Sequence, residues 1–463
     1  MSILIKGGTV FTAAESFHAD ILIENGKISK LGKNLATEDK VTTYDAQGME
    51  IYPGGIDPHT HLGLVLAGQK SPDDFHKGTI AALKGGTTTV LDYVVPTIGE
   101  SLLTAFHKWS EEAEGKSSVD YGAHMSLVGF PDFYSEEIPQ LKELGIGTLK
   151  CFGGYKGRNM QDDEQFLNIL EISKELSYLV LLHSENGHII SFLEKKLQSN
   201  GMLGPEFHHL AHPSWGEGES TYRAIKLAEF TEVPLYIVHI SCLESAEVIA
   251  NARLSGLPIM GETCPQYLLL CSDVYEQGGL KAAKFVLTPP LRESFHHQEL
   301  WRYLKNGVIQ VLATDNASYS TQQKAQGINN FMDIPNGLPS VGLRVPLLYT
   351  YGVQTGRLSR NRFVELVATN PAKIFGLYPQ KGGITIGGDA DLMVIDPSYS
   401  YTLTDENDPH AVDYSAYKGF QIDCGMKYVF LRGKLVVENG EFVGKAGQGH
   451  YIRSPGLEGM QIV

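Results

Sequence analysis

YLVLLHS at residues 178–184 and PLYIVHIS at 234–241 are two short apolar runs, and STYRAIKLAEF at 220–230 lies between them. Runs of four to eight residues rich in Val, Ile, Leu and Tyr predict strands, whereas apolar residues recurring three and four apart predict a helix. A strand, a helix and a second strand in this order form the βα unit of a parallel sheet. This segment therefore predicts an α/β fold.

The same alternation extends on both sides of this unit, over residues 54–375. The predicted strands are eight apolar runs: MEIYPGGID, TTTVLDYVV, VDYGAHMSLVG, IGTLKCF, YLVLLHS, PLYIVHIS, LPIMGETC and IQVLATD. Helical stretches such as SPDDFHKGTIAALKGG and DDEQFLNILEISKEL separate them. Eight such units predict a (β/α)8 TIM barrel. An open doubly wound sheet is the alternative, but GxGxxG does not follow the first strand and GxxxxGK[ST] is absent, which disfavours its nucleotide-binding versions.

Both ends of the chain are rich in predicted strands. ILIKGGTVF and ADILIENGKISKLG lie near the start, and GGDADLMVIDP and MKYVFLRGKLVVENGEFVG lie near the end. Asn25-Gly26 and Asn439-Gly440 are typical of two-residue hairpin turns. We therefore expect residues 1–53 and 376–440 to form one smaller β-sandwich domain, with the barrel at 54–375 and a tail at 441–463.

Charge and cysteine content exclude several classes of partner. The chain of 463 residues carries 38 basic and 53 acidic side chains, a net charge of −15, which argues against nucleic acid and anionic membranes. No apolar run is long enough to span a membrane, and MSILIKGGTV lacks the signature of a signal peptide. The five cysteines are an odd number without CxxC spacing, which argues against a disulfide framework. We expect a cytoplasmic protein.

Polar side chains capable of binding metal stand at the carboxyl ends of the predicted strands. They are His59, His61, Lys150, His183, His239 and Asp315. In a parallel barrel the active site forms at this end, where the loops after the strands converge. His59 and His61 are two residues apart and therefore project to the same side of an extended segment. Together these residues predict a metal site.

Each of these residues also has a structural interpretation. A single histidine at a strand end is more often hydrogen-bonded than a metal ligand, and Asp315 could cap a helix. We weigh the joint placement of all six above these separate explanations. By contrast, the group His208, His209 and His212 predicts a solvated surface loop, and His296-His297 predicts an exposed helix start. Asp73-Asp74 predicts a helix N-terminus.

The ordered set of motifs resembles the hydantoinase/dihydropyrimidinase family of cyclic amidohydrolases. The resemblance rests on GGIDPHTH at residues 54–61 together with Lys150, His183, His239 and Asp315. It extends over nearly the whole chain through LIKGGTV, GGTTTVLD, GETCPQYLLL, TPPLR, IPNGLPS and NPAKIFGLYPQKG. It implies a barrel with a β-sandwich built from both termini.

The resemblance also implies a cofactor and a set of ligands. Two divalent metal ions per chain, zinc with manganese as the alternative, would be bridged by a carbamylated Lys150. His59 and His61 with Asp315 would hold the more buried metal, and His183 and His239 would hold the other, with a hydroxide bridging the pair. Carbamylation turns a buried ammonium into a carboxylate with two oxygen ligands, which explains why a lysine stands there.

The resemblance assigns roles in the ring opening of a hydantoin or dihydropyrimidine to an N-carbamoyl amino acid. Asp315 would move the proton from the attacking hydroxide to the leaving nitrogen. Tyr155 would donate a hydrogen bond to the developing oxyanion, and the backbone at Thr288 and Asn336 would hold the cyclic imide. The family is commonly homotetrameric; we expect a homotetramer or homodimer, and GKAGQGHYIRSPG resembles an arm that reaches a neighbouring subunit.

Several positions depart from the family pattern. Asn316 stands where the family has histidine, Thr288 where it has serine, and Gly342 where it has glutamate. The apolar loop at residues 62–66 and Phe152 predict a wall that favours an apolar ring substituent. Leu62-Gly63 in place of an arginine disfavours a dihydroorotase, and Tyr155 disfavours an allantoinase. An allantoinase-like or other cyclic amidohydrolase and a non-catalytic oligomeric relative are the alternatives.

Overall fold

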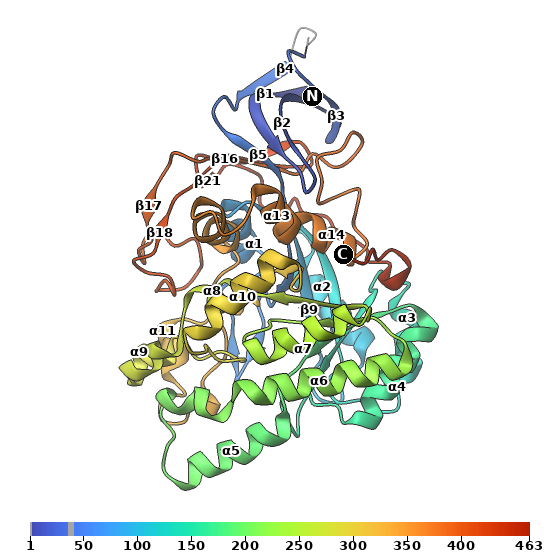
Figure 1. The fold of residues 1–463 in the computed structure, drawn as a ribbon, viewed down its shortest axis with the longest axis vertical. Helices are drawn as coiled ribbons and strands as arrows, with labels where there is room; N and C mark the ends of the chain where they lie inside the picture. The colour runs from blue at the N-terminus through green and yellow to red at the C-terminus, as the bar shows by residue number, and fades with distance from the viewer. Residues whose placement is uncertain (1, 36–40) are drawn as a thin grey trace.

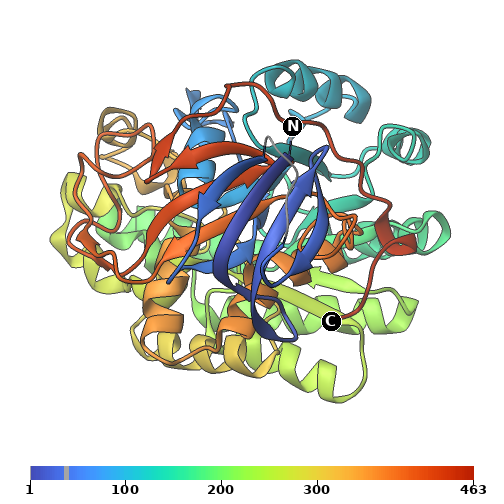
Figure 2. The ribbon, with the colours of Figure 1, turned by 90° about the horizontal axis from the view of Figure 1, so that it is seen from above.

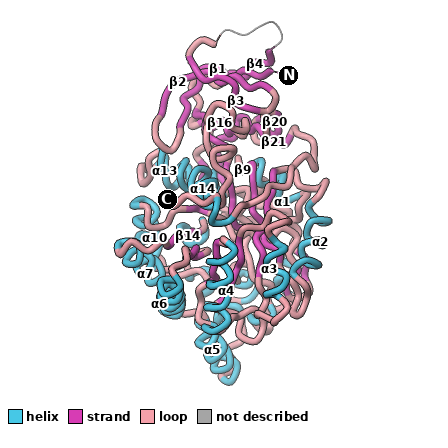
Figure 3. Tube along the Cα trace, turned by 90° about the vertical axis from the view of Figure 1, so that its right-hand side faces the viewer, coloured by secondary structure: helices cyan, strands magenta, loops and turns pink. Residues whose placement is uncertain are grey.

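The computed structural model describes residues 2–35 and 41–463. A barrel surrounded by helices forms one part of the molecule, and a sheet built from both ends of the chain lies above it (Figure 1). Viewed from the side, the barrel strands lie inside and the longer helices lie around them (Figure 3). Residues 1 and 36–40 of the expected segment 1–53 lie outside the described residues.

The barrel is a sheet of eight strands in the order β15-β14-β13-β12-β11-β10-β9-β6. All neighbouring strands are parallel. Their bounds are β6 (Gly55–Thr60), β9 (Thr87–Val94), β10 (Asp120–Ser126), β11 (Thr148–Phe152), β12 (Leu179–His183), β13 (Leu235–Ile237), β14 (Ile259–Thr263) and β15 (Val311–Leu312). Thr60 pairs with Asn316, and the Asp315 N–H donates to the His59 carbonyl at 2.9 Å, so the ring closes between β15 and β6. The predicted TIM barrel is confirmed.

Amphipathic helices cover the outside of this ring. The longer ones are α1 (Lys77–Lys84), α2 (Leu102–Ala113), α3 (Tyr134–Leu141), α4 (Asp163–Leu176), α5 (Gly187–Ser199), α6 (Ser214–Thr231), α7 (Leu243–Leu254) and α10 (Phe295–Asn306). The short ones are α8 (Pro265–Leu269), α9 (Gly279–Ala283), α11 (Thr321–Ala325), α12 (Arg344–Leu348), α13 (Arg360–Val364) and α14 (Asn370–Ile374). α4 shows why they form: Asp162 and Gln165 make a reciprocal capping box, and Phe166, Ile169 and Leu170 form the buried face.

The first predicted strand, MEIYPGGID, is two strands in two different sheets. β5 (Glu50–Pro53) pairs with β1 and β16, whereas β6 begins at Gly55 and pairs with β9. Gly54 lies between them, and a Cβ there would stand 2.3 Å from the Thr88 hydroxyl oxygen. The chain therefore crosses between the sheets at a point where a side chain has no room. Periodicity alone could not place this break because both halves are fully buried.

The second sheet has nine strands and joins the two ends of the chain, as the blue and red strands of Figure 2 show. Its strands are β1 (Ser2–Phe11), β2 (Ser16–Glu24), β3 (Lys27–Gly32), β4 (Val41–Asp45), β5, β16 (Leu392–Asp396), β19 (Gly425–Leu431), β20 (Lys434–Glu438) and β21 (Glu441–Phe442). Tyr44 on β4 contacts the rings of Tyr428 and Phe430 on β19 at 5.2 and 5.1 Å. Because β4 and β19 are not neighbours in the sheet, the sheet curls over its own core. The expected β-sandwich is confirmed.

The hairpin turns of this sheet match their sequence signals. Asn25 and Gly26 have φ of 52° and 80°, and Asn439 and Gly440 have φ of 50° and 80°. Positive φ at both central residues is the type I′ geometry that Asn-Gly favours. A separate two-stranded ribbon is formed by β17 (Tyr401–Thr402) and β18 (Gln421–Ile422).

The C-terminal tail packs along the amino ends of the barrel strands of its own chain. The Ile452 N–H donates to the Tyr121 carbonyl at 2.7 Å, and the Ser454 N–H donates to the Gly145 carbonyl at 2.8 Å. Contact of the tail with a neighbouring subunit stays a prediction. Among the described residues, no helix combines the length and the apolar composition that a membrane crossing requires.

Candidate metal centre

The predicted site residues come together at the carboxyl end of the barrel. They line one cavity of about 760 Å³ whose wall includes His59, His61, Lys150, Tyr155, His183, His239, Thr288, Asp315 and Asn336. His59 and His183 lie in β6 and β12, Lys150 lies in β11, and the others follow their strands in loops. The placement follows from the parallel topology, because the carboxyl ends of all eight strands face the same way.

His59, His61 and Asp315 form the first of two ligand clusters. The Asp315 Oδ1 atom lies 3.0 Å from His59 Nε2 and 3.2 Å from His61 Nε2, and the two Nε2 atoms are 3.3 Å apart. The second ring nitrogen of His59, Nδ1, bonds to the buried carboxylate of Glu262. Burial by itself lowers the pKa of His59, but Asp315 and Glu262 outweigh it and raise the pKa to about 9. This cluster therefore favours a positive charge at its centre.

His183 and His239 form the second cluster. Nδ1 of His183 faces Nε2 of His239 at 2.9 Å, and both rings are buried. The other nitrogen of His183, Nε2, lies 2.9 Å from Glu185, whose second oxygen lies 2.9 Å from His212. Burial and the neighbouring charges of His183 and Lys150 hold the pKa of His239 well below its usual value. Glu185 thus fixes which nitrogen of His183 faces the cavity.

Lys150 is a buried ammonium without an acid to balance it. Its side chain is 2% exposed, and its Nζ lies over the rings of Tyr93 and Phe152 at 4.8 and 5.6 Å. Among the described residues this Nζ has no hydrogen-bond or ion-pair partner. Burial lowers its pKa to about 8, although Asp315 and Glu262 oppose the shift. At neutral pH, a larger fraction of Lys150 than of an exposed lysine is therefore the neutral amine, which can react with carbon dioxide.

The donor set of the two clusters fits a pair of divalent cations. Facing imidazole nitrogens about 3 Å apart repel each other unless a proton or a cation lies between them. Nitrogen and carboxylate oxygen are ligands that zinc prefers, and each ligating histidine usually bonds a carboxylate through its other nitrogen. Glu262 and Glu185 supply those carboxylates for His59 and His183. Lys150, once carboxylated, would complete the set with two oxygens.

Three of the site residues have left-handed backbone conformations. Tyr155, His239 and Asp315 have φ of 58°, 40° and 55°, and none of them is glycine. Such conformations cost of order 1–3 kcal/mol each and persist only where the surrounding structure holds them. At Asp315, the backbone N–H bonds the His59 carbonyl. The strain therefore directs side chains from the loop ends into the cavity.

Tyr155, Thr288 and Asn336 line the same cavity, and the centre of the Tyr155 ring lies 4.9 Å from that of His183. The Asn336 amide donates to the Thr288 hydroxyl at 2.8 Å, and the Asn336 Oδ1 atom is buried without a partner among the described residues. Burial, Glu185 and Asp315 raise the pKa of Tyr155, so its phenol stays protonated. The buried Lys324 Nζ donates to the carbonyls of Val286 (2.7 Å) and Gly337 (2.9 Å) and so ties the two loops together.

Two predictions about other histidines are wrong. His208 and His212 are 2% and 6% exposed rather than solvated, because His208 bonds the Leu287 carbonyl and His212 bonds Glu185. His296 does lie in the first turn of α10, but it is fully buried, and its Nδ1 accepts from the Leu243 N–H at 3.1 Å. Pro205 begins a short 3₁₀-helix, Pro205–Ala211, which packs against α5 and α9, and Pro213 follows it.

Sequence reasoning missed the carboxylates that orient the ligands. Glu262 lies in β14, and Glu185 follows His183 by two residues. A signal was present in each case. Glu262 is a charged residue inside an apolar strand, LPIMGETC, and Glu185 has the two-residue spacing that also relates His59 to His61. For Glu262, the signal does not identify the histidine that the carboxylate contacts, because Glu262 and His59 are 203 residues apart.

The departures from the family pattern are accommodated by local packing. The Asn316 Oδ1 atom accepts from the N–H groups of Ser340 (2.8 Å) and Val341 (3.1 Å) and so holds the loop beside Asp315. A Cβ at Gly342 would lie 2.8 Å from the Ala81 carbonyl oxygen and 2.6 Å from Pro409 Cγ. The backbone at 342 thus leaves no room for the side chain that the family places there.

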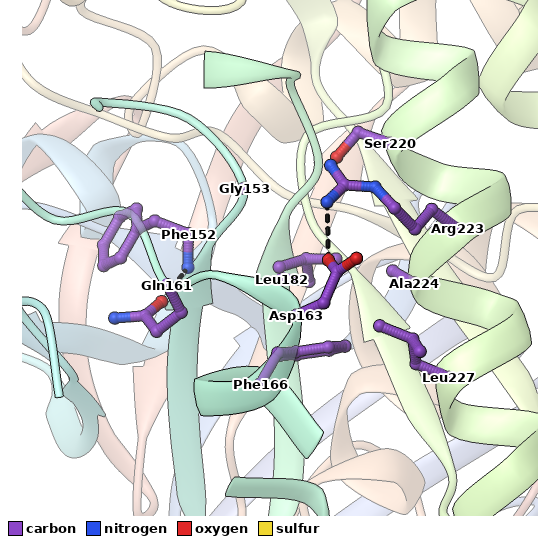
Figure 4. Close-up of a pocket in the computed structure, with 10 residues that line it drawn as sticks. All are labelled: Phe152, Gly153, Gln161, Asp163, Phe166, Leu182, Ser220, Arg223, Ala224 and Leu227. Atoms are coloured by element: carbon purple, nitrogen blue, oxygen red, sulfur yellow. Dashed lines mark hydrogen bonds and ion pairs between the residues drawn. The ribbon is translucent and has the colours of Figure 1, made fainter. Parts of the chain in front are cut away.

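A small second cavity, of about 20 Å³, lies between α4, α6 and the ends of β11 and β12 (Figure 4). The Arg223–Asp163 ion pair borders it, with Nη1 2.6 Å from Oδ1. Gln161 accepts from the Phe152 N–H at 2.7 Å, and its amide donates to the carbonyls of Leu127, Gly129 and Asn159. This cavity holds no reactive cluster; its residues fix the loop that carries Tyr155.

The fold and this rim of histidines, lysine and aspartate define a class of metallohydrolases. The chain matches the amidohydrolase family over residues 51–123 and 159–436, and it belongs to that family. It is similar to the D-hydantoinase of Geobacillus stearothermophilus, 43% identical over 98% of this chain and 96% of the relative. The dihydropyrimidinase of Arabidopsis thaliana is 37% identical over 98% and 85% of the two chains. A crystal structure of a D-hydantoinase superposes with a TM-score of 0.96 at 43% identity, covering 98% and 99%.

Proposed function

We propose that the chain is a metal-dependent hydrolase that opens hydantoin or dihydropyrimidine rings to N-carbamoyl amino acids. The observation that carries this function is the convergence of His59, His61, His183, His239 and Asp315 around a buried, unbalanced Lys150 in one cavity. The similarity to enzymes named D-hydantoinase and dihydropyrimidinase over nearly the full length supports it.

The metal pair would be held by these six residues, with zinc or manganese as the ion and carbamylated Lys150 between the two clusters. When bound, the ions lower the pKa of water and polarise the ring carbonyl. Glu262 and Glu185 hold His59 and His183 in the tautomers that present a nitrogen to the cavity.

Asp315 is the proposed proton acceptor. Burial alone would raise its pKa, but His59 and His61 hold the pKa of this carboxyl well below its usual value, so it stays ionised. It takes the proton of the attacking water and returns it to the ring nitrogen that leaves. Tyr155 stays protonated and donates a hydrogen bond to the oxyanion that develops on the attacked carbonyl.

Recognition of the cyclic amide is assigned to residues of the cavity wall that are not metal ligands. Backbone groups at Thr288 and Asn336 would bond the imide, on loops that Lys324 connects. Leu62, Leu64 and the strand β7 (Val65–Leu66), which pairs with β8 (Gln69–Lys70) in a short hairpin, form an apolar wall. The ring substituent would pack against this wall.

The test is an assay of zinc- or manganese-loaded protein in bicarbonate buffer against hydantoin, 5-phenylhydantoin, dihydrouracil and allantoin. We expect ring opening of a hydantoin or dihydrouracil by the wild type and none by Lys150→Ala. Hydrolysis of allantoin alone would replace the assignment with an allantoinase. Silence on all four substrates without bound metal would favour the non-catalytic relative.

We also propose a homo-oligomer, a tetramer or dimer. Four large apolar side chains on α5 and α6 are exposed: Phe192, Trp215, Tyr222 and Phe230. These helices lie at the end of the molecule away from the nine-stranded sheet (Figure 1). Exposed aromatic clusters of this kind are typical of interfaces. Light scattering coupled to gel filtration tests the proposal, and a Phe230→Glu variant should shift the mass toward the monomer.

A further inference from the structure

Four charged residues line the cavity outside the ligand clusters, and they differ in whether they have an ion-pair partner. They are Glu100, Lys108, Glu112 and Arg158. Glu100 pairs with Lys108 at 2.6 Å, and Glu112 pairs with Lys70 at 3.1 Å. Arg158 forms neither an ion pair nor a side-chain hydrogen bond with any residue that the structure describes. Of these four charged residues, Arg158 is therefore the one without an ion-pair partner among the described residues.

The backbone holds Arg158 in a defined place next to the reacting groups. The N–H groups of Arg158 and Asn159 donate to the Tyr155 carbonyl at 3.0 and 3.2 Å, which closes a tight turn after Tyr155. The Asn159 carbonyl accepts from the Gly129 N–H (3.2 Å) and the Gln161 amide (2.8 Å). The turn is thus tied to the loop after β10 and to Gln161, and this limits the positions that Arg158 can occupy.

Asn159 adds a second polar group to the same part of the wall. It lines the cavity beside Arg158, and its side-chain amide has no hydrogen-bond partner among the described residues. Another part of the wall is apolar, with Leu64, Val65 and Ile334 among its members. A substituent with an aliphatic stem and an anionic end matches both parts, since the stem removes apolar surface from water and the end meets a guanidinium.

We propose that Arg158, assisted by Asn159, selects cyclic amides whose ring substituent ends in a carboxylate. This proposal rests on the proposed function and names the substrate class of the same site. Arg158 acts as a specificity-determining residue, because the guanidinium binds the carboxylate of the substituent and not the ring that is opened. The expected preference is modest, since Arg158 is exposed and its ion pair is partly screened by water.

The test compares two hydantoins of nearly equal size, one substituted at position 5 with 2-carboxyethyl and one with 2-carbamoylethyl. We expect the wild type to favour the carboxylate in kcat/KM by about five- to tenfold. Arg158→Met should bring this ratio close to one, Arg158→Lys should keep part of it, and Asn159→Ala should lower kcat/KM for both compounds. The preference should shrink when the ionic strength rises from about 0.05 to 0.5 M, as expected for a screened charge.

Lys156→Met is the matched control, because Lys156 is a neighbouring cation that lies outside the cavity and contacts His188 at 2.9 Å. It should keep the wild-type ratio. An unchanged ratio in Arg158→Met, or a wild-type preference for the carbamoyl compound, would overturn the proposal. If no variant opened either ring, the proposed function would fail instead. Calorimetric binding of the two ring-opened products to wild type and Arg158→Met would then still decide the role of Arg158.

Discussion

The two ends of the barrel each bury a lysine beside acidic residues, but only one of these lysines is balanced. At the amino end, Lys381 Nζ lies 2.7 Å from Asp120, 2.5 Å from Asp391 and 3.1 Å from Asp389, and Arg432 also contacts Asp120. At the carboxyl end, Lys150 Nζ lies over the rings of Tyr93 and Phe152 and has no ion-pair partner within the described part of the chain, while Asp315 faces His59. The buried lysine at the amino end is therefore neutralised by its own carboxylates, whereas the buried lysine at the carboxyl end is not.

The difference separates a structural cluster from a reactive one. Burial by itself lowers the pKa of Lys381, but Asp391 and Asp389 outweigh it and raise the pKa, so this ammonium is the cation of its own cluster. Asp120, Asp389 and Asp391 are close enough together to hold a metal ion, yet Lys381 already supplies their positive charge. The His59, His61 and Asp315 cluster has comparable spacing, and among the described residues no lysine or arginine pairs with it. We therefore propose that the metal site is the one at the carboxyl end.

The largest expected effect is at the carboxyl end. Asp315→Asn removes the proposed proton acceptor and weakens one ligand, so kcat should fall by about 10³- to 10⁴-fold. The melting temperature of the metal-free protein should fall only modestly, because the Asp315 side chain is 16% exposed and its pair with His59 is partly screened by water. Steady-state kinetics and calorimetry check both parts; a variant that keeps a tenth of wild-type kcat would contradict the assigned role.

Lys381→Met should mainly destabilise the fold and leave the reaction intact. It leaves Asp120, Asp389 and Asp391 with Arg432 and Lys27 as their remaining cations, and breaking a buried ion cluster costs about 3–5 kcal/mol of unfolding free energy. Urea denaturation of the metal-loaded protein measures this loss, while KM and metal content should not change. Lys27→Met is the matched control: Lys27 also bonds Asp389 but its side chain is 46% exposed, so its loss should cost less than about 1 kcal/mol.

Tyr155→Phe should lower kcat by about 10²-fold, because it removes one hydrogen-bond donor to the developing oxyanion. Metal content should remain that of the wild type, since the phenol is not among the proposed ligands. The same loss in kcat accompanied by loss of metal would show instead that Tyr155 supports the metal clusters.

Lys324→Met should have the smallest effect, a rise in KM of about fivefold with kcat nearly unchanged. The buried ammonium ties the Val286 carbonyl to the Gly337 carbonyl, and these lie next to the residues assigned to the imide. Its loss should loosen the spacing between the two loops without touching the metal clusters. An equal fall in kcat at constant KM would place Lys324 in the chemistry and not in positioning.

The contrast between the two ends also explains what sequence could predict. The ligand rim follows local rules: its residues lie near the carboxyl ends of apolar strands, and parallel strands bring these ends together, so the sequence alone sufficed to assign His183 and His239 to the rim. Both sheets followed from strand and hairpin signals in the same way. The break at Gly54 did not, because the strands on either side of it are both fully buried.

The amino-end cluster had no local signal at all. Asp120, Lys381 and Arg432 come from three distant segments, and their contact depends on how the curled sheet sits on the barrel. Burial of His208, His212 and His296 was missed for the same reason, since each packs against a segment far away in the chain. Such tertiary contacts override the local polarity that predicted a solvated surface.

The metal content of the purified protein tests the central claim most directly. Metal analysis of the wild type and of Lys150→Ala, each loaded with zinc in bicarbonate buffer, should give about two ions per chain for the wild type and fewer than about one for the variant. Lys381→Met should bind as the wild type does. A wild type without metal, or a Lys150→Ala variant that still holds two ions, would contradict the assignment of the carboxyl-end cluster as a lysine-bridged metal centre.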